Sequence, residues 1–254
     1  MSELPEEDQE LSFLQHLVEL RGRLLKACLS VFVVLIVLLP FSRHLYEAIA
    51  SPMMAQMPEG SSMIAIDVAS PFLMPFKLTL LLSIMISIPV VLYQLWAFVA
   101  PALFKKEKRL ARPLLLSSVL LFYAGCAFAY FVVFPLVFGF LTRVAPEGVA
   151  VMTDISKYLD FVMTLFLAFG ITFEVPIATI ILVATGVTTA DKLTSWRPYI
   201  VVGAFAIGMI LTPPDVISQT LLALPMWVLF EIGIFFSRVL LPEKETEEAD
   251  QATN

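Results

Sequence analysis

Two short stretches of the chain each place a single glutamate among basic and apolar residues. Glu19 lies in 13–24, just before the first apolar run, and Glu107 lies in 98–109, between the second and third runs. A carboxylate binds arginine in a bidentate, charge-assisted geometry that lysine cannot reproduce. Two such carboxylates on one face of a membrane protein would form a receptor for a cationic peptide.

Both glutamates also have a purely structural interpretation. Glu19 precedes Arg23 by four residues, so the two side chains can form an exposed ion pair on a helix. Glu107 stands among five basic residues and can simply balance local charge. However, a negative charge inside a basic cluster weakens the attraction of that cluster to anionic lipid. The residues alone leave both interpretations open.

A third acid, Glu174, lies deep in an apolar run. An acid there costs several kcal/mol unless it is neutralised or faces water, so such acids are functional hypotheses by default. A functional or cavity-facing role and a hydrogen-bonded structural role are the two alternatives. Asp215 follows two prolines and can cap the last helix, and Gln219 can supply a hydrogen bond between helices.

Composition indicates that these residues belong to a polytopic membrane protein. The chain has 254 residues, of which 59% are hydrophobic and 15% charged, against about a quarter charged in an ordinary soluble domain. Its apolar runs are long enough for a hydrocarbon core about 30 Å thick, which needs roughly 20 helical residues. The net charge of −6 arises from acidic ends, and a basic nucleic-acid footprint is missing.

The apolar runs predict an all-α integral membrane fold of six helices. Thr212-Pro213-Pro214-Asp215 ends the fifth helix, because two prolines cannot continue it, so the last two helices should be antiparallel neighbours. We expect an acidic tail and amphipathic segment over 1–24, the membrane domain over 25–238 and an acidic, disordered tail over 239–254. The expected helices are about 25–40, 72–96, 113–140, 158–185, 198–211 and 216–238.

Four of these helices contain a proline deep in the run, at Pro89, Pro135, Pro176 and Pro225. Prolines kink membrane helices where neighbours satisfy the freed backbone groups, which suggests a cupped bundle. Helix 198–211 spans only about 21 Å at 1.5 Å per residue, and we expect the sixth helix to be short as well. Either the bilayer thins there or another helix covers them, or the fifth helix extends into its flanks.

Basic residues predict the orientation of the chain. Twelve of the 16 Lys and Arg residues lie before or at the start of the first helix, in the second and fourth loops, or at the end of the sixth helix or after it. The positive-inside rule then places both termini, Glu19 and Glu107 on the cytoplasmic face. In the first extracytoplasmic loop, 46–54 is expected to form a short interfacial helix.

The chain lacks the motifs of the common enzyme classes. Its only histidines are His16 and His44, so no HExxH motif exists, and neither GxSxG, P-loop nor GxGxxG is present. We therefore expect no enzymatic activity, no cofactor and no metal.

Four motifs, in one order along the chain, resemble the TatC family, the core membrane subunit of the twin-arginine protein translocase. The six-helix topology with both ends in the cytoplasm fits the family too. One such motif would be modest evidence, but four in register span most of the chain. They are Leu14-x-His16-Leu17-x-Glu19-Leu20-Arg21-x-Arg23, Phe98-x-x-Pro101-x-Leu103-x-x-x-Glu107, Phe173-Glu174-x-Pro176 and Thr212-Pro213-Pro214-Asp215.

The resemblance implies a cytoplasmic site for the twin-arginine signal peptides of folded export substrates. Glu19 and Glu107 would receive the paired arginines, and Arg21 would orient the amino-terminal segment. Phe98 and Pro101 would shape the loop around the peptide.

Further roles follow from the resemblance for residues away from that site. Glu174 would face the concave interior, while Pro52 and Asp215 would hold the extracytoplasmic caps. The single-helix subunits TatA and TatB would dock around the last two helices, in a multimeric complex of the bacterial cytoplasmic (inner) membrane driven by the proton motive force. The contact positions implied for them are Met209, Ile210 and Gln219.

A folded cargo cannot pass through a bundle this small, so we expect a receptor and assembly platform rather than a pore. The main alternative is a proton-coupled secondary transporter that uses Glu174, which would require more deep polar groups and usually repeat symmetry. A scaffold without a peptide site is the third possibility, and it would tolerate charge reversal at Glu19 and Glu107.

Overall fold

The computed structural model describes residues 6–54, 64–99, 111–144, 154–211 and 216–241. These residues are helical apart from short connections and one isolated β-bridge between Ile64 and Asp154. Five helical segments among them are long and apolar enough to cross a membrane, and Arg197–Ile210 is a shorter apolar helix. The predicted all-α membrane fold is therefore confirmed.

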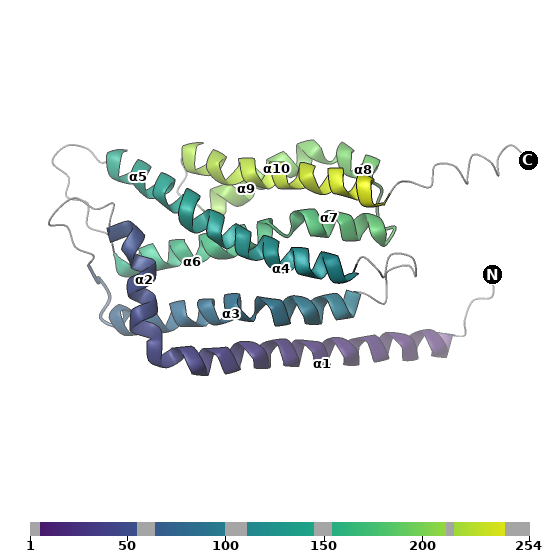
Figure 1. The fold of residues 1–254 in the computed structure, drawn as a ribbon, viewed down its shortest axis with the longest axis horizontal. Coiled ribbons are helices and arrows are strands. Elements are labelled where there is room, and N and C mark those ends of the chain that lie inside the picture. Colours follow the sequence, from purple (N-terminus) through teal and green to yellow (C-terminus); the bar gives the residue numbers. More distant parts are fainter. Residues whose placement is uncertain (1–5, 55–63, 100–110, 145–153, 212–215, 242–254) are drawn as a thin grey trace, which may run out of the picture. The chain divides into compact units, whose positions relative to one another are not determined.

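Figure 1 shows the elements in chain order. They are α1 (Glu6–Leu38), the 3₁₀ turn η1 (Leu39–Phe41), α2 (Ser42–Met54), α3 (Ser70–Val99), α4 (Ala111–Phe128), the π-helical turn η4 (Ala129–Val133), α5 (Phe134–Val144), α6 (Ile155–Thr172), α7 (Val175–Ala184), α8 (Ala190–Ser195), α9 (Arg197–Leu211) and α10 (Val216–Leu240).

The described residues fall into two compact units, and the division passes through α4 and α6. The first unit contains α1, α2, α3 and the starts of α4 and α6; the second contains the remainder of both helices with α5 and α7 to α10. Of the described residues, 6–54, 64–99, 111–119 and 154–163 belong to the first unit, and 120–144, 164–211 and 216–241 belong to the second.

In the first unit, α1 is a single helix that packs along α3. Its amino-terminal half lies beside the carboxyl-terminal end of α3 (Figure 1). The sequence suggested a separate amphipathic segment before a helix beginning near 25, but α1 already begins at Glu6. The physical reason is that no proline interrupts 6–38, and the single glycine there, Gly22, is tolerated at a cost of about 1 kcal/mol.

The loop between α1 and α3 contains α2, over Ser42–Met54, which packs on α3. The start of α6 is tied to this region by three hydrogen bonds. Ile155 donates its backbone N–H to Ile64 at 2.9 Å, and the Tyr158 hydroxyl donates to the carbonyl of Ile49 at 3.0 Å. The Ser156 hydroxyl bonds that of Ser70 at 2.6 Å.

In the second unit, α10 packs against α7, α8 and α9. One buried cluster between these helices consists of Leu193, Phe230 and Ile234. Helices α7 and α10 come close together at Gly233, where an added Cβ would lie 2.1 Å from Thr179 Oγ1 and 2.9 Å from Pro176 Cα. Only a residue without a side chain allows the two helices to come so near.

Prolines act differently in different helices. Pro176 has no N–H to donate to the carbonyl of Thr172, so one helical hydrogen bond is missing there. The segment predicted as one helix over 158–185 accordingly breaks at Phe173–Glu174, between α6 and α7. Ahead of Pro135 the helix widens into the π-turn η4. By contrast, Pro89 and Pro225 lie inside the continuous helices α3 and α10.

Of the last two helices, only α9 is short. It has 15 residues, about 22 Å at 1.5 Å per residue. Helix α10 has 25 residues, about 37 Å, so the expected shortness of the sixth helix is wrong. The last turn of α10 contains Arg238, whose guanidinium bonds Asp191 of α8 at 2.8 Å.

Candidate functional site

The Glu19 carboxylate of α1 already binds an arginine of the same helix. Arg23 donates from Nε at 2.9 Å and from Nη2 at 2.5 Å, both to Oε1 of Glu19. The Glu19 side chain is 38% exposed and that of Arg23 is 25% exposed. The ion pair between Glu19 and Arg23 that the spacing suggested is thus present. The same geometry shows that the Glu19 carboxylate accepts hydrogen bonds from a guanidinium.

The pair lies on the less exposed side of α1. Glu19, Gly22 and Arg23 share their side of the helix with Ala27, which is buried. Large apolar side chains occupy the other side and are exposed, as expected where a helix faces lipid while its polar groups face protein. They include Leu17, Val18, Leu24, Leu25, Leu29, Phe32, Val33, Ile36 and Val37.

The remaining residues predicted around the peptide are only partly placed. Arg21 is exposed on α1, and Phe98 is half-buried in the last turn of α3. Arg21 and Phe98 lie on α1 and α3, which pack together in the first unit. Pro101 and Glu107 lie outside the described residues.

Glu174 occupies the break between α6 and α7 and precedes the first turn of α7. Its N–H donates to Ile171 at 3.0 Å and its carbonyl accepts from Ala178 at 2.9 Å. The side chain is half-buried, in a position where the positive end of the helix dipole stabilises a carboxylate. The ring of the preceding residue, Phe173, packs on Phe128 of α4 with centroids 5.7 Å apart.

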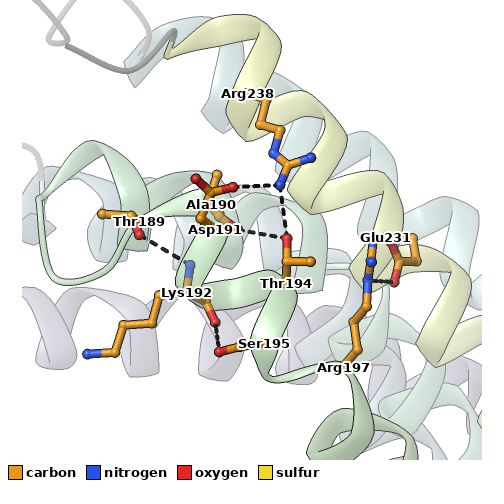
Figure 2. A network of polar contacts seen from close by, with 9 residues as sticks. All are labelled: Thr189, Ala190, Asp191, Lys192, Thr194, Ser195, Arg197, Glu231 and Arg238. Carbon is orange, nitrogen blue, oxygen red and sulfur yellow. Dashed lines mark hydrogen bonds and ion pairs between the residues drawn. The ribbon is translucent and has the colours of Figure 1, made fainter. Parts of the chain in front are cut away.

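A polar network that sequence analysis did not predict joins α8, α9 and α10 (Figure 2). Arg197 at the start of α9 donates from Nε and Nη2 to the two oxygens of Glu231, each at 2.6 Å. Arg238 bonds Asp191 at 2.8 Å and the Thr194 hydroxyl at 3.1 Å. Bidentate arginine–carboxylate pairs impose orientation as well as attraction, so the network sets how α9 meets α10.

The second unpredicted pair links α3 to α6 in the first unit. The Lys77 ammonium donates a hydrogen bond to the Asp160 carboxylate, and both side chains are about half exposed. Each residue lies within a segment that could cross a membrane. The sequence shows a basic and an acidic residue near the ends of two apolar runs. It does not show that they pair, because the pairing depends on which helices are neighbours.

The residues predicted to contact partner helices lie on the α9–α10 hairpin. Met209 and Ile210 are exposed, Ile210 to 83%. Gln219 forms a hydrogen bond between the two helices, in which its Nε2 donates to the carbonyl of Phe205 at 2.7 Å. Gly208 allows this contact, because an added Cβ there would lie 3.1 Å from Gln219 Cγ.

Replacing Gln219 by leucine is expected to loosen the hairpin without unfolding the protein. The lost bond is of the interhelical kind that contributes about 0.6 kcal/mol on average and about 1.7 at most. Unfolding of the full chain in detergent should show a decrease in stability of that size. Thr220→Val, at the exposed neighbouring position, should have no effect; equal losses in both variants would contradict the assignment.

Two further predicted residues are placed incompletely. Pro52 lies in α2, and Asp215 lies outside the described residues. No group of three or more His, Cys, Asp or Glu side chains that could hold a metal is found within the described ranges.

Comparisons with known proteins agree with one another. The family model described as Sec-independent protein translocase protein (TatC) matches residues 15–225. A TatC of this description from Azotobacter chroococcum mcd 1 is 54% identical over 250 residues, covering 98% of each chain. Another, from Escherichia coli strain K12, is 58% identical over 233 residues, covering 92% of this chain and 90% of the relative.

A solved structure has the same fold. The crystal structure of a protein described as the twin-arginine translocase receptor TatC matches with a TM-score of 0.79 at 38% identity, covering 88% of this chain and 98% of its own. Together with the spanning helices, this makes the protein a multi-span membrane protein with a role in protein transport. The chain therefore belongs to the TatC family of Sec-independent protein translocases.

Proposed function

We propose that the protein is the receptor and assembly core of a twin-arginine translocase. It binds the twin-arginine signal peptides of folded proteins, and export is driven by the proton motive force. The observation that carries this proposal is the Glu19–Arg23 pair, because it demonstrates a carboxylate at the amino-terminal end of the membrane domain in a geometry suited to a guanidinium. The solved relative described as a translocase receptor supports it.

In this proposal the peptide site is formed by the amino-terminal half of α1 and the segment that follows α3. Glu19 and Glu107 receive the two arginines, Arg21 orients the amino-terminal segment, and Phe98 with Pro101 shapes the loop. The packing of α1 on α3 supports the assignment, since it places the helix that carries Glu19 beside the helix that carries Phe98.

The same proposal assigns orientation and partners. The protein lies in the bacterial inner membrane with both termini in the cytoplasm, as the distribution of basic residues predicts. TatA and TatB dock at the α9–α10 hairpin, where the exposed Met209 and Ile210 support a helix-binding surface. Glu174 is the deep acid of the membrane interior, and Pro52 and Asp215 hold the caps on the opposite face.

Binding of a twin-arginine signal peptide to the purified full chain in nanodiscs tests the function. Glu19→Lys and Glu107→Lys should each weaken binding by more than about 1 kcal/mol, above the usual range for an exposed ion pair. A twin-lysine peptide should bind more weakly throughout, because an ammonium cannot form the bidentate contact.

Glu47→Lys provides the matched control. Glu47 is an exposed glutamate of α2, so its reversal changes the net charge equally without touching the proposed site. Equal affinity in all variants for both peptides would eliminate the peptide site. A loss in Glu47→Lys as large as in the other two would mean that only overall charge matters.

A further inference from the structure

The Glu19 carboxylate is occupied, in this structure, by the same chemical group that the proposed ligand would bring. Both bonds from the Arg23 guanidinium, at 2.9 and 2.5 Å, end on one oxygen of Glu19. A guest arginine would need this carboxylate in a similar charge-assisted arrangement. The internal arginine and the guest therefore compete for one acceptor.

The helix makes the internal contact favourable but weak. Glu19 and Arg23 are separated by four residues in the continuous helix α1, with the glutamate on the amino-terminal side, which is the better orientation for such a pair. With side chains 38% and 25% exposed, the pair belongs among partly solvated ion pairs, whose contribution to stability is small. A contact of that strength holds the carboxylate in the free protein and still yields to a ligand.

We propose that Arg23 is an internal occupant of the Glu19 carboxylate, which a guest arginine displaces, and that Arg23 thereby sets the affinity of the peptide site. This inference rests on the proposed function of Glu19. Only the fraction of molecules with the pair open binds the guest, so the apparent dissociation constant rises by the inverse of that fraction. For an exposed pair of ordinary strength the factor is about two to six.

The competition also predicts what Arg23 does not do. Displacing the internal arginine is equally unfavourable for an arginine guest and for a lysine guest, so Arg23 lowers both affinities by the same factor. Preference for arginine then comes from the contact that forms afterwards. Arg23 therefore controls how tightly the peptide binds, and the carboxylates control which peptide binds.

The test is the affinity of the full chain in nanodiscs for labelled twin-arginine and twin-lysine signal peptides. Arg23→Gln should bind both peptides about two to six times more tightly than the unchanged protein. Arg23→Lys keeps the positive charge but loses the bidentate guanidinium. Its affinity for each peptide should lie between those of Arg23→Gln and the unchanged protein. In a Glu19→Gln background the gain from Arg23→Gln should vanish, because no carboxylate remains to be released.

Lys26→Gln separates this effect from overall charge. Lys26 is exposed on the same helix, seven residues from Glu19, and its replacement removes the same positive charge. A gain in Lys26→Gln equal to that in Arg23→Gln would overturn the proposal. Unchanged binding in Arg23→Gln would overturn it as well, and so would weaker binding, which would make Arg23 a residue that positions Glu19.

The two proposals fail in different ways. If Glu19→Lys abolishes binding and Arg23→Gln does not strengthen it, the peptide site stands and the internal occupant is rejected. If Glu19→Lys binds like the unchanged protein, both are rejected. Circular dichroism of each variant checks that α1 remains helical, so that a change in affinity reports on the site.

Discussion

Gly233→Leu is expected to prevent stable folding of the second unit. Even the first carbon of a side chain at 233 would lie 2.1 Å from Thr179 Oγ1 and 2.9 Å from Pro176 Cα. The threonine could rotate away only by giving up its 2.7 Å hydrogen bond to the carbonyl of Pro176. The proline Cα is backbone and cannot move without separating α7 from α10, which would open the core around Phe230.

The size of this effect follows from the packing of the two helices. Overpacking a well-packed core costs about 1–3 kcal/mol, and more where backbone must shift. We expect little monodisperse protein after extraction into detergent and a clear decrease in melting temperature for the fraction that remains. Both quantities can be measured by fluorescence-detected size exclusion with a heating step.

Gly203→Leu is the matched control for this substitution. Gly203 lies in α9, and nothing is within 4 Å of the position of its added Cβ. The same change from glycine to leucine should therefore leave yield and melting temperature near those of the unchanged protein. Equal losses at both positions would show that helix propensity or hydrophobicity, rather than the close approach to α7, governs the outcome.

Reversing one charge of the Lys77–Asp160 pair is expected to reduce the amount of folded protein severely. Lys77→Asp or Asp160→Lys would leave two like charges facing each other between α3 and α6, within segments apolar enough to span a membrane. A charged residue at the centre of such a helix already costs about 2.5–3.5 kcal/mol on insertion scales. This pair is half exposed near the ends of its helices, so the expected loss for one reversal is lower, about 2 kcal/mol.

The charge-swapped double variant distinguishes pairing from mere charge sensitivity. Lys77→Asp together with Asp160→Lys restores opposite charges, and the coupling between the two changes should recover at least half of the lost stability. Folded yield and thermal stability in detergent are the measurements. A double variant as unstable as the worse single one would mean that the two residues act through other neighbours.

Much of the fold follows directly from local features of the sequence. The lengths of the apolar runs predict the spanning helices, because the bilayer sets the length an apolar helix must have. The missing N–H of a proline accounts for the break before Pro176 and for the π-turn before Pro135. The Glu19–Arg23 contact is also local, since residues four apart meet on any helix.

Local features misjudged some boundaries for an equally physical reason. The amino-terminal amphipathic segment and the first apolar run have different compositions, yet they form the one helix α1. Helix continuity depends on the absence of breakers and on packing along α3 rather than on a change in polarity. Composition therefore marks where the chain is apolar, but it does not mark where a helix begins.

The contacts between helices were decided by the tertiary structure alone. Asp160 lies 83 residues from Lys77, Arg238 lies 47 from Asp191, and Glu231 lies 34 from Arg197. Each charge is visible in the sequence, but a partner at such a separation depends on which helix faces which, and no periodicity encodes that choice. The sequence by itself determined the spanning helices and the arginine-binding chemistry of Glu19, because these depend on segment length and on spacing within one helix. Only packing determined the ion pairs between helices and the close approach at Gly233, because these require two distant segments to share one space.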